Sequence, residues 1–514
     1  MICHDIEADI EKMHSTEEPD TVSDRSLVGY GIGSVRTRSD NNVPLSEEGN
    51  IPRVMFASSG SGCGKTAVTT AFLEVMKRRK IRSVSFKCGP DYIDPMFHKK
   101  VLGIESLNLD AFFASGDHIR DTVFHCDGDM AVIEGVMGLY DGISVKNTEG
   151  SCYDIARITN IPIVLILDCK GAGRTVISLI KGILYDDEAH LIKGIILNRM
   201  SASYYDKLLP VLKEEIGRIR DDVRIAGYIP NDKAFTLEGR HLGLTFPDEI
   251  TDIRKKISDM ADILEKGCEI DIILKIAEEA GKNIRPGISE KDMVSPEVVP
   301  ESDESPLYLA VAEDEAFCFY YAENLRLFEK YGVKIRPFSP VRDKKLPEGV
   351  SGILIGGGYP ELHLKELSGN TSMSDSLKKA IESGMPSLAE CGGFMYLHES
   401  VEDIKGEEYR LTGVIPGKCF YTGHLVNFGY VSIEGCRESG GTGEAFTGMR
   451  GHEFHYYDST SNGNDMVLTK PVSGKKYEAM HAGDGHLWGF PHLYYPSASG
   501  AIEEFILKMK EYSL

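Results

Sequence analysis

The feature that most constrains this chain is a glycine-rich turn that joins an apolar run, Val54–Ala57, to an amphipathic helix. A strand, a glycine turn and a helix in this order are typical of a phosphate-binding loop, because backbone N–H groups can converge there on phosphate oxygens and the helix N-terminus favours negative charge. We therefore expect a nucleotide, with Lys65 on its β- and γ-phosphates and the Thr66 hydroxyl on Mg²⁺. The residues predicted to hold it are Gly60, Gly62, Gly64, Lys65 and Thr66.

The turn departs from the strict pattern G-x-x-x-x-G-K-[ST], which requires glycine where this chain has Ser59. Residues 60–66 read GSGCGKT, a variant typical of one branch of phosphate-loop enzymes. The alternative is a glycine-rich turn with a chance lysine. The strand before the turn and the helix after it favour the nucleotide site.

Composition limits the classes of function. The chain has 514 residues, enough for several domains, and a formal net charge of −22. That charge argues against a general nucleic-acid or anionic-membrane binder, although a local cationic site can still hold an anionic substrate. Eleven scattered cysteines without a C-x-x-C pair fit a reducing compartment. With no signal pattern and no apolar run of about 18 residues, we expect a cytoplasmic protein.

Apolar runs alternate with helical stretches from Arg53 to Lys266, as in a doubly wound, mostly parallel α/β sheet. The runs after the first are 84–86, 130–134, 163–167, 194–197 and 225–229. In such sheets ligands bind beyond the carboxyl ends of the strands, so the polar residues that end the runs are site candidates.

Four groups of polar residues follow these runs. They are Asp91 with Asp94, Glu134 with Asp141, Asp168, and Asn198 with Arg199. Carboxylates at strand ends suit Mg²⁺ coordination beside a triphosphate, and we predict Thr66, Asp91 and Glu134 as the metal ligands. Alternatively, Asp91 and Asp94 cap turns, Asp168 caps a helix and Asn198 is a turn residue. Four groups in one α/β unit favour a site.

Composition also divides the chain. Residues 1–50 are polar and predicted to be a partly flexible extension, residues 51–283 form the first domain, and 284–306 form a linker rich in Pro, Ser, Glu and Asp. A second α/β domain spans 307–514. Residues 236–244, TLEGRHLGL, indicate only a helix start or a loop.

The second domain carries a cysteine between a short strand, Ser387–Ala389, and a helix. This context predicts a nucleophile elbow at Cys391, with a thiol pKa lowered by the helix N-terminus and an oxyanion hole near Gly356–Gly358. The alternative is a buried structural thiol. A histidine base is expected among six candidates, His424, His452, His455, His481, His486 and His492.

The run Gly451–Tyr457, GHEFHYY, is not the metal motif H-E-x-x-H, because its histidines are only three residues apart. We interpret His452 and His455 as structural or interface residues, with contact to a ligand as the lesser alternative. The run from Gly435 to Thr447 is predicted to be a surface loop.

Taken together, the motifs resemble the glutamine-dependent a,c-diamide synthases of corrinoid and related tetrapyrrole biosynthesis. They are GSGCGKT, FKCGPDYIDP, NLD, EGVMGLYDG, ILNRM, GRHLGL, EDEAFCFYYAENL, FSPVRD, GGGYPEL, AECGGFMYL, GVIPGK and GHEFHYY, in this order. The resemblance covers about residues 53–500. It implies a first domain similar to dethiobiotin synthetase and a second that is a class I glutaminase. Relatives include cobyrinate and archaeal Ni-sirohydrochlorin a,c-diamide synthases.

The resemblance also implies residue roles. Cys391 corresponds to the glutaminase nucleophile and His492 to its base, while Lys65 and Thr66 correspond to the nucleotide and Mg²⁺ contacts. The acidic residues of the synthetase site correspond to Asp91, Asp94, Glu134 and Asp141. Asn198 is predicted to contact the nucleotide. The family generally lacks the acidic third member of the class I triad, and no acid closely follows His492.

The implied reaction uses ATP, Mg²⁺ and L-glutamine to amidate the a and c carboxylates of a tetrapyrrole through an acyl phosphate. Cobalt and nickel tetrapyrroles both stay open as substrates, and a homodimer is possible. One alternative is a cobyric acid synthase type that amidates other peripheral carboxylates. Another is a nucleotide-switch protein with an inactive glutaminase domain, which an intact Cys391 elbow argues against.

Overall fold

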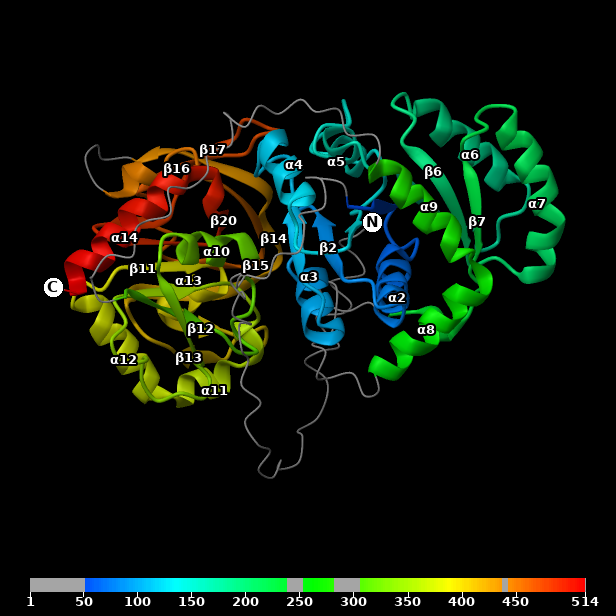
Figure 1. Cartoon of the computed structure of the whole chain (residues 1–514). Helices are drawn as coiled ribbons and strands as arrows, with labels where there is room; N and C mark the ends of the chain where they lie inside the picture. Colours follow the sequence, from blue (N-terminus) through cyan, green and yellow to red (C-terminus); the bar gives the residue numbers. More distant parts are fainter. Residues whose placement is uncertain (1–50, 238–252, 282–305, 437–441, 514) are drawn as a thin grey trace, which may run out of the picture. The chain divides into compact units, whose positions relative to one another are not determined.

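The computed structural model describes residues 51–237, 253–281, 306–436 and 442–513, which belong to two compact units (Figure 1). The described part of the first unit lies within 51–281 and that of the second within 306–513. The predicted extension 1–50, nearly all of the linker 284–306 and the GRHLGL run lie outside the described residues.

The first unit is built on a seven-stranded sheet in which every pair is parallel, in the order β3-β2-β4-β1-β5-β6-β7. The strands are β1 Arg53–Ser58, β2 Ser83–Cys88, β3 Ser106–Leu109, β4 Met130–Glu134, β5 Ile163–Asp168, β6 Ile192–Asn198 and β7 Arg224–Tyr228. Their residues are mostly apolar and nearly all buried, as expected of a sheet covered on both faces. The predicted doubly wound fold is confirmed, and only β3 was not predicted.

Helices connect these parallel strands, since a parallel pair needs a crossover. The connecting helices are α2 Lys65–Arg78, α3 Ile93–Phe97, α4 Gly116–Phe124, α5 Cys152–Thr159, α6 Thr175–Asp186 and α7 Ala202–Gly217, with a π-helical turn η1 at His98–Leu102. A 3-10 turn η2 at Lys233–Phe235 and the helices α8 Ile253–Gly267 and α9 Ile270–Gly281 follow the last strand, β7. Helix α2 buries Val68, Phe72, Val75 and Met76 completely, and it packs against β1, β2, β4 and α8.

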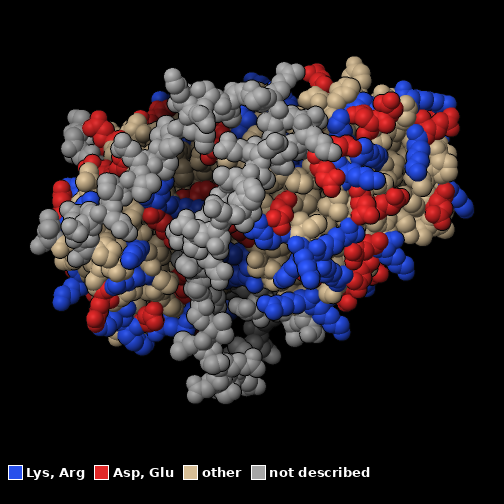
Figure 2. Space-filling view, in the orientation of Figure 1, with Lys and Arg blue, Asp and Glu red and all other residues tan. Residues whose placement is uncertain are grey.

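On the face drawn in Figure 2, acidic and basic side chains of the described residues are interspersed. Arg78 on α2, for example, pairs with Asp262 on α8 at 2.6 Å and with Glu265 at 3.3 Å. Exposed pairs of this kind contribute little to stability, so we assign them no role in the site.

The second unit contains a six-stranded sheet in the order β18-β19-β11-β10-β8-β9, parallel except at β18. Its strands are β8 Tyr308–Ala312, β9 Lys334–Phe338, β10 Gly352–Ile355, β11 Ser387–Glu390, β18 His481–Gly483 and β19 His486–Gly489. The helices are α10 Ala322–Lys330, α11 Leu364–Gly369, α12 Thr371–Glu382, α13 Gly392–Leu397 and α14 Ser499–Ser513, with 3-10 turns at Pro360–Leu362, Thr442–Phe446 and Tyr495–Ala498. The predicted second α/β fold is confirmed.

A second sheet in this unit was not predicted. Its order is β13-β12-β14-β15-β20, and β16 and β17 extend it beside β14. The strands are β12 His398–Glu402, β13 Glu408–Arg410, β14 Ile415–Cys436, β15 Arg450–Ser459, β16 Met466–Thr469, β17 Lys476–Ala479 and β20 His492–Tyr494. Of the predicted loop from 435 to 447, residues 437–441 lie outside the described part. Residues 442–446 form a 3-10 turn that buries Phe446, so this part is not a plain surface loop.

Candidate functional site

The glycine-rich turn links the end of β1 to the start of α2. Gly64 precedes α2 with a left-handed φ of 94°, and a Cβ there would lie 2.4 Å from Nδ2 of Asn198. That amide donates a hydrogen bond to the carbonyl of Cys63 at 2.8 Å. Glycine at 64 therefore lets Asn198, at the end of β6, reach the turn. Gly62 also has a positive φ, of 73°.

Lys65 lies at the centre of the turn. Its Nζ donates to Oγ of Ser58 and the carbonyl of Gly60, both at 3.0 Å, and to the carbonyl of Met137 at 2.6 Å. Burial lowers the pKa of this ammonium group, and nearby Lys87 lowers it further. The side chain is therefore held by backbone and hydroxyl oxygens of the turn and of the segment after β4.

Three oxygen-bearing side chains meet at Thr66, the second residue of α2. The hydroxyl of Thr66 donates to Oε1 of Glu134 at 2.5 Å and lies 3.4 Å from Oδ2 of Asp94. Burial raises the pKa of Glu134 to about 8, with the carboxylate of Asp94 as the next cause. The structure thus brings together Thr66 and two of the four predicted acidic residues.

Lys87, on β2, was not predicted as a site residue. Its Nζ donates to Oδ2 of Asp94 and, at 2.8 Å, to Oε1 of Glu134. Burial alone would lower its pKa, but the carboxylates of Asp94 and Glu134 hold the pKa well above its usual value. For Asp94, burial alone would raise the pKa, but the ammonium of Lys87 has the larger combined effect and the pKa is lowered. A lysine directly after the apolar run 84–86 was the available signal, because a charge buried in a strand needs a partner.

Asp91 and Asp141 have other surroundings. Oδ1 of Asp91 accepts hydrogen bonds from the N–H groups of Ile93 at 2.8 Å and Asp94 at 3.3 Å, so it caps the turn that starts α3. Its Oδ2 lies 3.9 Å from Nζ of Lys87. Burial raises the pKa of Asp91 to about 6. Asp141 is exposed, and its carboxylate accepts from the N–H of Gly138 at 2.8 Å within a local turn.

Asp168 and Arg199 form a further pair at the ends of β5 and β6. Nη1 of Arg199 lies 2.7 Å from Oδ2 of Asp168, and its Nη2 donates to the carbonyl of Gly62 at 3.0 Å. The guanidinium therefore contacts the glycine-rich turn itself, which makes Arg199 a candidate nucleotide contact in addition to Asn198.

The donor set of Thr66, Asp94 and Glu134 fits Mg²⁺. All three offer hard oxygen ligands, and Oε2 of Glu134 is buried without a hydrogen-bond partner. Within the described ranges, no group of three or more His, Cys, Asp or Glu side chains is arranged to hold a metal by itself. Mg²⁺ usually takes only one or two carboxylates and completes its shell with water and phosphate oxygens. The geometry therefore favours Asp94 over the predicted Asp91 as the second carboxylate ligand.

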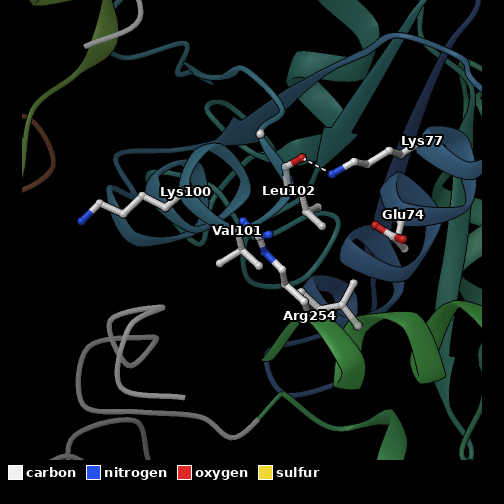
Figure 3. Close-up of a pocket in the computed structure, with 8 residues that line it drawn as sticks. Glu74, Lys77, Lys100, Val101, Leu102 and Arg254 are labelled. Carbon is white, nitrogen blue, oxygen red and sulfur yellow. Dashed lines mark hydrogen bonds between the residues drawn. The ribbon is translucent and has the colours of Figure 1, made fainter. Parts of the chain in front are cut away.

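A hollow elsewhere in the first unit lies between α2, η1 and the start of α8 (Figure 3). Lys77, Lys100 and Arg254 contribute positive charge to its lining, and Nζ of Lys77 donates to the carbonyl of Leu102 at 2.8 Å. Its lining includes no residue of the glycine-rich turn or of the acidic set, so it is distinct from the candidate site.

In the second unit, Cys391 has the predicted geometry of a nucleophile elbow. It stands between β11 and α13 with φ 47° and ψ −106°, a strained conformation for a residue with a side chain. Its N–H donates to the carbonyl of Gly489 at 2.8 Å. A Cβ on Gly393 would lie 2.1 Å from the carbonyl oxygen of Ile355, so the close packing of the elbow on β10 requires glycine.

The turn Gly356–Gly358 contacts both the elbow and one of the six candidate bases. A Cβ on Gly392 would lie 3.3 Å from the backbone nitrogen of Gly358, and a Cβ on Gly357 would lie 2.2 Å from Cε1 of His492. His492 is thus the candidate that the structure places at the same turn as Cys391. His452 pairs with His492 across β15 and β20, and the ring of His455 stacks on Phe490 at 4.0 Å.

The remaining histidines have other contacts. Nε2 of His481 lies 2.8 Å from the carbonyl oxygen of Ser461, the ring of His486 stacks on Trp488 at 4.2 Å, and His424 is exposed. We therefore keep His492 as the base, which stays a prediction.

The predicted lowering of the Cys391 pKa is wrong for this structure. Burial raises the pKa of the thiol, and the carboxylate of Glu361 raises it further. Helix α13 has only six residues, and its N-terminus does not offset these effects. Burial, with His452 and His455 nearby, lowers the pKa of His492 to about 3. At neutral pH the site therefore holds a neutral thiol and a neutral imidazole.

We expect the alkylation rate of Cys391 by iodoacetamide to keep rising with pH, because the reactive thiolate is a small fraction far below a raised pKa. The rate should increase about tenfold per pH unit between about pH 7 and pH 9, without a plateau. Peptide mass spectrometry measures it, with the half-buried Cys436 as internal reference. A plateau below about pH 8 would show a lowered thiol pKa instead.

Comparisons with known proteins find a matching family model for each of the two units. Residues 54–244 match the CobQ/CobB/MinD/ParA nucleotide binding domain, and residues 308–490 match the CobB/CobQ-like glutamine amidotransferase domain. The chain is 35% identical over 435 residues to a cobyrinate a,c-diamide synthase of Listeria monocytogenes, and the aligned region covers 84% of this chain and 93% of that protein. It is 34% identical over 463 residues to a cobyrinate a,c-diamide synthase of Caldanaerobacter subterraneus, and that aligned region covers 88% of this chain and 97% of the relative.

Proposed function

This chain belongs to the cobyrinate a,c-diamide synthase family, and on that premise we propose that it amidates the a and c side-chain carboxylates of a tetrapyrrole with ATP and glutamine. The observation that carries the proposal is the presence of two candidate sites in one chain. One is a phosphate-binding turn beside Thr66, Asp94 and Glu134, and the other is the Cys391 elbow.

The first site suits activation of a carboxylate. A carboxylate is a poor electrophile, and transfer of the γ-phosphoryl group from ATP to its oxygen gives an acyl phosphate with a good leaving group. The ammonium of Lys65 and the N–H groups of the turn stabilise the charge on the transferring phosphoryl group. Bound through Thr66, Asp94 and Glu134, Mg²⁺ would supply further positive charge at the phosphates. Lys87, held between Asp94 and Glu134, fixes the orientation of both carboxylates.

The second site suits release of ammonia from glutamine. His492 accepts the proton of the Cys391 thiol as the sulfur attacks the side-chain amide, and it returns the proton to the leaving nitrogen. Ammonia departs and leaves a thioester, which water hydrolyses to glutamate and the free thiol. The ammonia then displaces phosphate from the acyl phosphate and forms the amide. Two rounds give the diamide.

The geometry at Thr66 supports different roles for Asp94 and Asp91. We expect Asp94→Asn to lower ATP-dependent amidation by about 10²-fold and to raise the Mg²⁺ concentration needed for half-maximal rate, because a ligand is lost. Asp91→Asn should cost about tenfold or less at saturating Mg²⁺, since Asp91 mainly caps α3. Magnesium titrations of both variants measure this. A stronger magnesium dependence in Asp91→Asn would reverse the assignment.

Product mass spectrometry tests the substrate. Purified protein is incubated with ATP, Mg²⁺ and glutamine, and cobyrinate and Ni-sirohydrochlorin are offered in separate reactions. The names of the relatives favour cobyrinate, so we expect two amidations of that substrate. Two amidations of Ni-sirohydrochlorin would extend the function to a nickel tetrapyrrole. Amidation of neither, with ATP hydrolysis intact, would overturn the proposed substrate class.

Two alternatives have less support. An enzyme of the cobyric acid synthase type would amidate other carboxylates, which the same product spectra would reveal as a different number of added amides. A nucleotide switch would need no glutaminase, and the strained φ of Cys391 argues against it, since strain of this kind is retained where function needs it.

No helix in the described part of the chain is both long and apolar enough to cross a membrane. We propose that the enzyme works in the cytoplasm, where ATP and glutamine are available. The possible homodimer stays a prediction.

A further inference from the structure

The segment that carries His492 is fixed by a buried amide on another element. Nδ2 of Asn324, on α10, donates to the carbonyl of Leu493 at 2.7 Å, and its Oδ1 accepts from the N–H of Tyr495 at 2.9 Å. Asn324 is 4% exposed. One rigid side chain therefore holds a backbone acceptor and a backbone donor directly after His492.

The same segment is held from the nucleophile's side by Glu390, the residue before Cys391. Its carboxylate accepts hydrogen bonds from the N–H of Leu493 and from the hydroxyl of Tyr495. Glu390 is 6% exposed, and its Oε1 has no hydrogen-bond partner. Strand β11, which ends at Glu390, lies in one sheet of the unit, and β20 lies in the other. Glu390 thus bridges the two sheets next to both predicted catalytic residues.

A cysteine–histidine pair needs a third group that orients the base. The two residues that follow His492 are Leu493 and Tyr494, so no acid stands there to do so. The ring of His492 fits closely against the turn at Gly357, where even a Cβ would lie 2.2 Å from Cε1. Such a fit makes the position of the His492 backbone decisive, because a shift of about 1 Å can cost about 10²-fold in rate.

We propose that Glu390 and Asn324 are positioning residues of the glutaminase, which together hold residues 493–495, and through them His492, in register with Cys391. The inference rests on the proposed function, since it concerns the glutamine-hydrolysing half of that reaction. Neither residue touches the reacting atoms in this assignment. Glu390 works as a neutral or charged acceptor, because what it supplies is two hydrogen bonds to the β20 segment.

The test measures glutamine hydrolysis by four variants of the full-length protein. Asn324→Ala and Glu390→Leu remove the hydrogen bonds and should lower kcat by about 10- to 100-fold, while KM for glutamine stays within about twofold. Glu390→Gln keeps an acceptor at the same place and should restore most of kcat. Asn370→Ala is the matched control. Asn370 is 3% exposed and donates to the carbonyls of Pro340 at 2.8 Å and Asp343 at 2.7 Å.

Each variant is also assayed with ammonium chloride in place of glutamine and by thermal melting. We expect ammonia-dependent amidation to persist, and we expect Asn370→Ala to lower Tm without lowering kcat. If Asn324→Ala and Glu390→Leu lower only Tm, as Asn370→Ala should, the positioning role is wrong. If Glu390→Leu does not fold, Asn324→Asp decides, since it replaces the donor to Leu493 by an acceptor at constant size. Wild-type protein that hydrolyses no glutamine would instead overturn the proposed function.

Discussion

Cys391→Ala is expected to abolish glutamine-dependent amidation, with a loss of more than about 10³-fold, and to leave ammonia-dependent amidation near the wild-type rate. The physical reason is that the thiol is the nucleophile that forms the thioester. Alanine has no nucleophilic atom, so the thioester intermediate cannot form. The alanine side chain fits the same backbone at φ 47° at least as well as cysteine, so the elbow should persist.

The measurement compares two nitrogen sources in one assay. Amide formation is followed by product mass spectrometry with saturating glutamine and then with ammonium chloride at a pH where free ammonia is present. Cys436→Ala is the control, because Cys436 is a half-buried thiol of the same unit at the end of β14. It should keep both activities. Full glutamine-dependent activity in Cys391→Ala would contradict the glutaminase assignment, and loss of both activities would indicate damage to the fold instead.

Much of this fold follows from local sequence. The run before Lys65 is apolar, the turn is rich in glycine and the helix after it is amphipathic, so each local preference agrees with the element formed. The same holds for the short strand before Cys391 and the two glycines after it. In both cases the chemistry lies within about ten residues of the strand end, where periodicity and turn residues suffice.

The choice between Asp91 and Asp94 could not be made from the sequence. The two residues are three apart, and both follow the same strand. Only the path of the backbone into α3 decides that Asp91 caps the turn and Asp94 reaches Thr66. Lys87 had a signal, a charge inside a buried strand, but its partner Glu134 comes from another strand, 47 positions further along the chain.

The antiparallel sheet of the second unit is a case of non-local pairing. Strand β14 is 22 residues long and pairs with β12, β15 and β16, with register shifts within its pairing to all three. Bulges interrupt the alternation of apolar and polar residues from which a strand is predicted. The cross-strand pair of His452 and His492 joins positions forty residues apart, so no local pattern could indicate it.

The second large effect is expected at Lys65. Lys65→Met keeps the length and the apolar stem of the side chain but removes the charge, and it should lower ATP-dependent amidation by about 10²- to 10³-fold with either glutamine or ammonia. In this structure the ammonium is held by Ser58, Gly60 and Met137, so it is already directed into the turn. Methionine cannot donate hydrogen bonds, and the developing phosphoryl charge would lose the positive charge of Lys65.

The control is Lys77→Met on the same helix, because Lys77 is exposed and its Nζ donates to the carbonyl of Leu102 at 2.8 Å, away from the turn. Amidation and nucleotide binding are measured for both variants, and alkylation of Cys391 reports whether the second unit stays intact. A loss confined to Lys65→Met that ammonia does not rescue places the defect at activation of the carboxylate, before nitrogen transfer. Because Cys391→Ala should be rescued by ammonia and Lys65→Met should not, the two variants together separate the two half-reactions. Rescue of Lys65→Met by ammonia would contradict the role of the turn in activation.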